Sequence, residues 1–425
     1  MSTAEVRSDY AKLIEPTRIH GSLYTEPGVF QDEMDRIWHR GWVYVGHESE
    51  VRAPGDYCRK TIGLQPIIMT RDEAGEVHLL MNRCSHRGNR LCDEETGNSH
   101  AFRCPYHGWT FDNSGALIGV PFNTGYESMA YAKEHFGLGR VPRVASYRGF
   151  VFGSLAPDGP SLRDHLGLAA DALDRLADLS PAGEIEIRTR WIKHWVHANW
   201  KLVLENETDG YHPPFVHQSV YRAVSAGSRE KYFRGSTTNV VKDLRQGHAE
   251  LDFRPEYRRD GSTFQWFGRI AESRLPAYLD AMQQRYGDAA RQKLVDGPPH
   301  VLVFPNLFIA ELNLLVIQPV NPTETIQLEA PVLLKGAPEL DSRILRRFEG
   351  GFGPAGALGA DDAVMYERNQ SGLEASQPDW IELVRGLHRE REEGGAIVSE
   401  VTDETTQRGF WQHYRSLMTG QAANR

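Results

Sequence analysis

The chain has 425 residues, of which 40% are hydrophobic and 25% charged; this composition is typical of a globular protein and excludes wholesale disorder. The formal net charge of −9, without a long Lys/Arg run, disfavours nucleic acid or an anionic membrane as the main partner. Apolar runs are too short to span a bilayer, the first ten residues lack a signal-peptide core, and the cysteines number four, so we expect a cytoplasmic protein without a disulfide framework.

The first predicted element is a helix over residues 29–38. Phe30, Met34 and Ile37 recur in it at helical spacing, which favours a buried apolar stripe. We assign residues 1–41 to an N-terminal helical segment that packs on the larger, C-terminal domain.

From about residue 42 the pattern changes to short β-rich runs separated by turn clusters of Asp, Asn and Gly. The runs cover residues 66–70, 77–81, 100–103 and 109–111. They predict a small antiparallel β domain over residues 42–156.

Two ligand pairs lie inside this β domain, each directly after a predicted strand. Cys84 and His86 form the first pair, and Cys104 and His107 the second. Four such ligands suit either a zinc ion or an iron–sulfur cluster. A zinc finger usually repeats one residue type within a pair, whereas here each pair holds one Cys and one His. That mixture is typical of a Rieske [2Fe–2S] centre, in which two thiolates hold one iron and two imidazoles the other.

The residues around the ligands agree with a cluster. Gly88 and Gly108 allow tight loops, and Tyr106 and Trp109 are expected to shield the cluster from water. Neither loop has a further cysteine, so no disulfide ties the loops together. The two remaining cysteines have no histidine at ligand spacing and are interpreted as buried thiols: Cys58 and Cys92.

Residues 157–160 form a linker-like break, and Ser161 is a candidate N-cap for the helix that follows. The remaining chain, 157–425, alternates longer helices with strands. This pattern predicts an α+β domain built on an antiparallel sheet. Strands are expected at 185–195, 301–304, 312–320 and 325–331.

A second constellation lies between residues 199 and 217. Glu205, Asp209 and His212 fall at i, i+4 and i+7, which predicts that they share one face of a helix. Two prolines follow His212, and the residue before a proline is pushed out of the α region. His217 is therefore expected to return from a bent or restarted segment.

Two imidazoles and one carboxylate can form a facial triad, which binds non-haem Fe(II) and leaves three positions open for O2 and substrate. Asp209 is better placed to accept the other ring N–H of His212 than to bind the metal. A distant carboxylate is then expected as the third ligand. In isolation an H-x4-H pair is a weak signal, and the neighbouring His194 and His197 are interpreted as structural.

With both constellations described, the chain resembles the α (large, catalytic) subunit of Rieske non-haem iron ring-hydroxylating oxygenases. The resemblance covers nearly the whole length. Its motifs are the segments 30–45 and 54–57, Cys84-Ser-His-Arg-Gly88, Cys104-Pro-Tyr-His-Gly-Trp109, Asn199-Trp-Lys201, Glu205-Asn206 with Asp209, His212 and His217, and Gly353-Pro-Ala-Gly356 with Asp361-Asp362.

The resemblance implies the remaining site residues. The second aspartate of the downstream pair, Asp362, is the expected third iron ligand; Asp361 is the alternative, with loop capping as its other role. Family members usually continue this pair with Glu-Asn, whereas this chain continues with Ala363-Val364. Asn206 matches a pocket-lining position of the catalytic site.

The resemblance also implies an architecture. A helix-grip catalytic domain with an antiparallel sheet stands beside the Rieske domain, and the subunits form a head-to-tail trimer. The trimer is a homotrimer (α3) or carries a small β subunit (α3β3). His107 of one subunit would approach His212 of the partner subunit, with Asp209 bridging the two.

The function implied is hydroxylation of an aromatic substrate with O2 at a mononuclear Fe(II), supplied with electrons by the [2Fe–2S] cluster. The electrons come from NAD(P)H through a reductase, in some systems with a ferredoxin. An aromatic acid is one candidate substrate, since Arg222 or Arg229 is able to bind a carboxylate, although solvation is the simpler role for both. Alternatives are a monooxygenase that hydroxylates once or removes an O- or N-alkyl group, and, more distantly, a zinc-stabilised ligand-binding protein.

Overall fold

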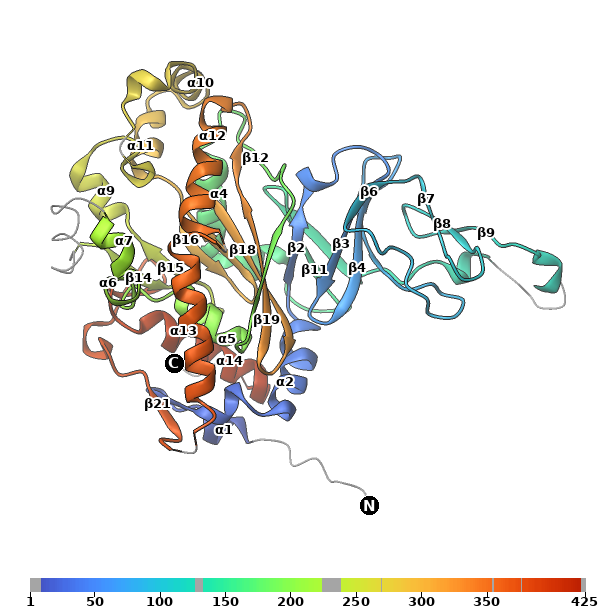
Figure 1. Ribbon diagram of the computed structural model, residues 1–425, viewed down its shortest axis with the longest axis horizontal. Helices are drawn as coiled ribbons and strands as arrows, with labels where there is room; N and C mark the ends of the chain where they lie inside the picture. The colour runs from blue at the N-terminus through green and yellow to red at the C-terminus, as the bar shows by residue number, and fades with distance from the viewer. Residues whose placement is uncertain are drawn as a thin grey trace. The chain divides into compact units, whose positions relative to one another are not determined.

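The computed structural model describes residues 9–126, 133–223, 238–268, 270–353, 355–375 and 377–421. The chain divides into two compact units: Trp38–Leu162 is the smaller, and the larger combines Met1–Ile37 with Arg163–Arg425 (Figure 1). These divisions fall a few residues from the expected boundaries 41/42 and 156/157. Helices and antiparallel sheets make up the described chain, so the expected α+β class is confirmed. Every helix in the described ranges is too short or too polar to cross a bilayer.

The smaller unit contains three antiparallel sheets. In spatial order their strands are β10 (Arg143–Tyr147), β11 (Phe150–Ser154) and β2 (Val43–His47); β5 (Val77–Met81), β4 (Gln65–Arg71), β3 (Asp56–Ile62) and β6 (Thr96–Asn98); and β7 (Ala101–Arg103), β8 (Thr110–Asp112) and β9 (Leu117–Gly119). One apolar cluster joins the last two sheets and includes Cys84, Cys92, Cys104 and Trp109. The metal-ligand loops therefore arise directly from the core.

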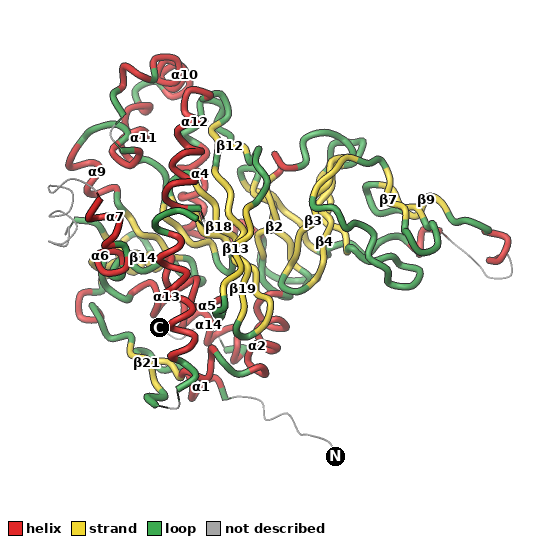
Figure 2. The backbone as a smooth tube through the Cα atoms, in the orientation of Figure 1, coloured by secondary structure: helices red, strands yellow, loops and turns green. Residues whose placement is uncertain are grey.

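The larger unit is built on a nine-stranded antiparallel sheet (Figure 2). The strand order is β13 (Ile192–Val196), β19 (Glu324–Pro331), β18 (Asn313–Asn321), β17 (Leu307–Ala310), β16 (His300–Val303), β15 (Ala249–Asp252), β14 (Val240–Asp243), β23 (Ala396–Glu400) and β22 (Arg391–Glu393). Two small sheets pair β1 (Arg18–His20) with β21 (Trp380–Glu382), and β12 (Ile185–Glu186) with β20 (Leu333–Leu334).

The α-helices of the described residues are α1 (Tyr10–Leu13), α2 (Pro27–Glu33), α3 (Leu162–Leu166), α4 (Ala170–Ala177), α5 (Trp200–Glu207), α6 (Pro213–Val216), α7 (Gln218–Ala223), α9 (Arg254–Asp260), α10 (Pro276–Tyr286), α11 (Ala289–Asp296), α12 (Pro338–Arg347), α13 (Gly359–Gly372) and α14 (Thr405–Thr419). Helix α13 contacts α5, α6 and strand β13, whereas α14 packs on β14, β15 and β23. The contacts of α13 matter for function, because they bring its first turn to the loop that carries the two histidines.

The helix predicted over residues 29–38 is present as α2 followed by a wider π-helical turn, Met34–Trp38. Glu33 at its centre is buried and accepts hydrogen bonds from Trp200 Nε1 (2.8 Å), Lys201 Nζ (2.5 Å) and Tyr414 Oη (2.6 Å). A buried ion pair is tolerated only when its remaining polar atoms are satisfied, as they are here. The N-terminal segment thus packs on α5 and α14.

The single helix face predicted for Glu205, Asp209 and His212 is wrong. Helix α5 ends at Glu207, and residues 208–212 form a turn in which Asp209 Oδ1 accepts the backbone N–H of Tyr211 at 2.5 Å. A Cβ on Gly210 would lie 2.2 Å from the carbonyl oxygen of Val401, so the chain passes too closely there for another residue. The break precedes the prolines, and His212 itself keeps helical angles, φ −69° and ψ −33°.

Candidate metal centres

The first site is formed by two similar loops in the smaller unit. The N–H of Gly88 donates to the carbonyl of Cys84, and the N–H of Gly108 donates to that of Cys104, both at 2.9 Å. Both glycines have positive φ, +76° and +71°, where a side chain would be strained. Each loop therefore closes immediately after its Cys/His pair, and the two pairs face one another.

The four predicted ligands lie close together, with cysteine beside cysteine and histidine beside histidine. The thiols of Cys84 and Cys104 are hydrogen-bonded to each other and both residues are 2% exposed. The rings of His86 and His107 lie 4.7 Å apart between centroids. Thiol beside thiol and imidazole beside imidazole is the pairing that a Rieske cluster requires, since each iron takes ligands of one type.

The chemistry of these donors also fits the cluster. Burial raises the pKa of the Cys84 thiol, so the free thiol stays protonated until a metal takes the thiolate. Burial, and then the neighbouring His107, lowers the pKa of His86, which favours the neutral ring that binds metals. His86 Nδ1 is buried without a hydrogen-bond partner among the described residues, as a ligand atom should be in the absence of its metal.

The two aromatic residues expected to shield the cluster differ. Trp109 is buried and stacks on the His86 ring, 4.7 Å between centroids and 7° from parallel. Tyr106 is 56% exposed and is therefore not buried against the ligands as Trp109 is. Its ring instead lies 3.7 Å from that of His107, with the Arg87 guanidinium over it at 5.6 Å. Position i+2 in a tight loop points outward, which the sequence pattern did not reveal.

The second site is in the larger unit. The Oδ1 atom of Asp362 lies 3.4 Å from His212 Nε2 and 3.4 Å from His217 Nε2. These three residues form a group of potential metal ligands whose donor atoms all lie within 4.8 Å of one another. Asp362 Oδ1 is buried and accepts no hydrogen bond there, so its partner is missing from the protein itself. Two imidazoles and one carboxylate at this spacing fit a facial triad.

The local sequence explains this convergence. His212 and His217 flank the single turn of α6, and Pro213 and Pro214 occupy its first positions, where no backbone N–H is needed. Asp362 lies in the first turn of α13, where the helix dipole favours a carboxylate. The glycines leading into α13 make a turn that excludes a side chain: a Cβ on Gly356 would lie 2.5 Å from the oxygen of Gly351.

Two further carboxylates lie on the outer sides of the histidine rings. Asp209 Oδ2 is 3.4 Å from His212 Nδ1, and Asp361 Oδ2 is 3.6 Å from His217 Nδ1. Ser219 Oγ donates to Asp361 at 3.2 Å. Asp361 thus faces away from the point where the other three residues meet, and Asp209 has the orientation expected of a group that fixes a ring tautomer.

The pKa values of the two histidines in the second site depend on burial and on the carboxylates beside them. Burial lowers the pKa of His212, but the neighbouring carboxylates of Asp209 and Asp362 outweigh burial and raise the pKa to about 9. For His217, burial dominates and lowers the pKa. The carboxylates thus attract positive charge to this pocket, and a bound divalent cation would satisfy them.

Sequence reasoning missed a group of residues next to this triad. Tyr366 lies one turn after Asp362 on α13 and donates to Glu207 Oε1 at 3.0 Å. Asn206, the residue expected to line the pocket, reaches the Tyr366 hydroxyl at 3.5 Å through Nδ2. The i, i+4 spacing of Asp362 and Tyr366 was a usable signal for Tyr366. The sequence held no comparable signal for Glu207, because its role depends on where α13 packs.

The other candidate residues lie elsewhere. His194 and His197 are on and just after the edge strand β13, and the backbone N–H of His197 bonds Glu367. Arg222 is exposed and donates to Gln218 at 3.1 Å, while Arg229 is outside the described residues.

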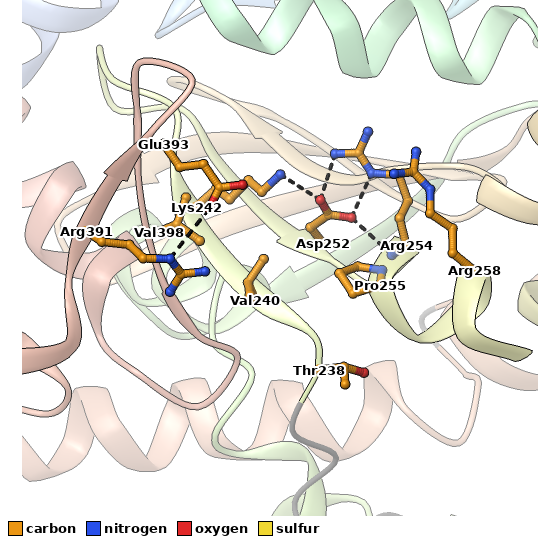
Figure 3. A pocket seen from close by; sticks show the side chains of 10 residues that line it. All are labelled: Thr238, Val240, Lys242, Asp252, Arg254, Pro255, Arg258, Arg391, Glu393 and Val398. Carbon is orange, nitrogen blue, oxygen red and sulfur yellow. Dashed lines mark hydrogen bonds and ion pairs between the residues drawn. The ribbon is translucent and has the colours of Figure 1, made fainter.

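A separate cavity of about 410 Å³ is lined by Thr238, Val240, Lys242, Asp252, Arg254, Pro255, Arg258, Arg391, Glu393 and Val398 (Figure 3). Asp252 pairs with Lys242 and Arg254, both at 2.7 Å, and the metal-binding residues are not part of its lining.

Comparisons with known proteins agree with this geometry. Residues 41–136 match the Rieske [2Fe-2S] domain, and residues 176–420 match the ring hydroxylating alpha subunit (catalytic domain). The chain is 30% identical to the 2-halobenzoate 1,2-dioxygenase large subunit of Burkholderia cepacia, over 87% of this chain and 80% of the relative. It is 33% identical to the N,N-dimethyl phenylurea N-demethylase subunit alpha of Sphingobium sp., over 67% and 61%. Naphthalene 1,2-dioxygenase from Rhodococcus sp., bound to indole, superposes with a TM-score of 0.86 at 26% identity, covering 99% of this chain and 100% of that structure.

Proposed function

Because this chain belongs to the ring hydroxylating alpha subunit family, we propose that it is the terminal oxygenase component that hydroxylates an aromatic substrate with O2. The observation that carries the proposal is the convergence of His212 Nε2, His217 Nε2 and Asp362 Oδ1 in a chain that also holds two Cys/His loops. When bound, the mononuclear iron activates O2 and the [2Fe–2S] cluster supplies single electrons.

Each side chain then has a defined task. Cys84 and Cys104 hold one iron of the cluster, and His86 and His107 hold the other. His212, His217 and Asp362 would hold the mononuclear iron, and three protein ligands would leave it positions for substrate and O2. Asp209 Oδ2 lies 3.4 Å from Nδ1 of His212, where it is placed to accept that N–H and so keep Nε2 free for the metal. Asn206, hydrogen-bonded to Tyr366, stands beside the ligands.

Partners and assembly are part of the same proposal. Relatives include a large oxygenase component of a 2,4-dinitrotoluene dioxygenase system, so this chain is expected to work with a separate reductase and, in some systems, a ferredoxin that pass on electrons from NAD(P)H. The chain forms an α3 or α3β3 trimer in which His107 approaches Asp209 of the partner subunit. We also propose the cytoplasm as the compartment, as the small number of cysteines in the sequence predicts.

A single hydroxylation or a dealkylation is the second candidate, because one relative is an N-demethylase. The same ligands serve both reactions. Products formed under 18O2 separate them: a dioxygenase places both labelled atoms in the product, whereas a monooxygenase places one there and one in water.

The test begins with the purified protein. We expect a reddish-brown protein with visible absorption, and an EPR signal after reduction that a zinc protein cannot give. A panel of aromatic acids, anilines, indoles and neutral arenes, supplied with O2 and a reductase, then identifies the product. A colourless protein that contains zinc and no iron would refute the proposal.

A further inference from the structure

Tyr366 is a buried side chain whose hydroxyl lies where polar groups from three elements meet. It is 1% exposed and belongs to α13. Its hydroxyl donates to Oε1 of Glu207, the last residue of α5, at 3.0 Å. Asn206 Nδ2 lies 3.5 Å from the same hydroxyl, and Gln327, in β19, is a further polar neighbour. A buried polar atom is costly to leave unpaired, so the bond to Glu207 fixes where Tyr366 stands against α5.

The bond between Tyr366 and Glu207 connects the two segments that carry the metal ligands. Asp362 lies one turn before Tyr366 on α13, an axial distance of about 6 Å. Glu207 ends α5 and precedes the turn that leads to His212. Helix α13 contacts both α5 and α6. The bond therefore holds the helix of the carboxylate ligand against the segment that leads to the histidine ligands.

Two other contacts of α13 lie farther from the ligand or are exposed. Gln370 Oε1 accepts the backbone N–H of the N-cap residue of α5 at 2.9 Å, but Gln370 lies about 12 Å beyond Asp362 along the helix. Ser219 Oγ donates to Asp361 at 3.2 Å where both side chains meet solvent. Of the three links, that of Tyr366 is the buried one nearest to Asp362.

A metal can bind all three ligands only if their spacing is kept. Asp362 Oδ1 lies 3.4 Å from Nε2 of His212 and 3.4 Å from Nε2 of His217. Because these atoms come from two separate segments, a small slide of α13 along α5 would move the carboxylate away from both rings. Residues that orient metal ligands from outside typically account for roughly 10- to 100-fold in metal affinity.

We propose that Tyr366 is a positioning residue for the mononuclear iron site: its bond to Glu207 fixes the start of α13 and so holds Asp362 opposite the two histidines. The inference rests on the proposed function, since it takes the three converging residues to bind iron. It adds a determinant of iron affinity that is not itself a ligand.

The experiment measures Fe(II) affinity without turnover. The mononuclear iron is removed from the purified protein with a chelator, and Fe(II) is returned under argon in competition with a colorimetric chelator. Unchanged visible absorption of the cluster shows that the first centre stays intact. We expect Tyr366→Phe to weaken Fe(II) binding about tenfold, because phenylalanine fills the same space without the bond. An unchanged affinity in the folded variant would overturn the inference.

Tyr278→Phe is the matched control. Tyr278 is 1% exposed on α10 of the same unit, and its hydroxyl donates to the carbonyl oxygen of Leu179 at 2.7 Å. Each variant loses one buried hydrogen bond, so both should lower the melting temperature to a similar extent. Only Tyr366→Phe should weaken Fe(II) binding. An equal loss of affinity in both variants would assign the effect to general destabilisation and refute the positioning role.

Substitutions at Glu207 test the same bond from its other side. Burial, and then Asp362, raises the pKa of Glu207, so the neutral amide of Glu207→Gln resembles the buried acid and keeps an acceptor oxygen. This variant should retain most of the Fe(II) affinity, whereas Glu207→Leu removes the acceptor and should reproduce the tenfold loss. If Tyr366→Phe fails to fold, this pair serves in its place. Equal affinities of the glutamine and leucine variants would contradict the assignment.

Failure of this inference can be told apart from failure of the proposed function. If all the variants bind Fe(II) as tightly as the unaltered protein, the proposed function stands and Tyr366 has no positioning role. If the unaltered protein binds Fe(II) but oxidises no aromatic compound of the panel, the proposed function fails, and the affinities still test Tyr366. If the unaltered protein binds no Fe(II) at this site, both are refuted.

Discussion

The two metal centres are built in opposite ways. The ligands of the first come from two neighbouring loops within residues 84–107, each closed by its own glycine turn. The ligands of the second come from the single turn of α6 and from the start of α13, with most of the nine-stranded sheet between them in sequence. The first is a local structure placed on a core, whereas the second exists only when the whole larger unit has folded. The effects of a substitution should therefore differ between the two centres.

The largest expected effect is at the second centre. Asp362→Ala removes the carboxylate that both histidines face, so we expect mononuclear iron affinity to fall by at least roughly 100-fold and turnover to disappear. Visible absorption of the cluster should remain, because the other centre lies in a different unit. Iron content by elemental analysis checks this. Asp361→Ala is the control: it should keep most of the iron, and iron loss there with retention in Asp362→Ala would reverse the ligand assignment.

The converse change tests the local centre. Cys104→Ser should remove the cluster, and with it the visible absorption and the EPR signal of the reduced protein, because both buried thiols are needed to hold one iron. The mononuclear iron should stay bound, as iron analysis after reconstitution with Fe(II) will show. Loss of both irons would mean that the two units depend on each other for folding.

A smaller effect is expected at Asp209. Asp209→Asn should leave both centres loaded and reduce turnover roughly 10- to 100-fold, because the carboxylate beside His212, which we propose also bridges to the neighbouring subunit, becomes neutral. Asp361→Asn is matched, since Asp361 lies in the same way beside His217. The Asp361→Asn variant should keep the turnover per bound iron unchanged. Near-normal turnover of Asp209→Asn would exclude the bridging role.

The smallest effect concerns the loop glycines. Gly108→Ala and Gly88→Ala both force a side chain into the left-handed region, at a cost of about 1–2 kcal/mol each. A Cβ at Gly108 would also lie 2.9 Å from Pro121 Cγ, whereas at Gly88 the nearest atom is the movable Arg83 Nε at 3.3 Å. The temperature at which cluster absorption bleaches should therefore fall further for Gly108→Ala. Equal shifts would show that crowding adds nothing to the strain.

This contrast also explains what the sequence predicted. Spacing alone identified Cys84, His86, Cys104 and His107 and the type of centre, because their geometry is local. Asp362 came only from a family resemblance, since no periodicity links it to His212. The helix end at Glu207 was missed because Gly210 is required by a close approach of Val401, a tertiary contact. Glu207 gave no signal, because its contact with Tyr366 depends on how α13 packs.

The uneven exposure of the first centre has a further consequence. Its sulfur atoms face the core, while the His107 edge lies under the exposed ring of Tyr106. A cluster held this way would be shielded by the core on its thiolate side. On the other side imidazole and phenol would stand between it and solvent, so an oxidant arriving from solvent would meet these groups before the thiolates.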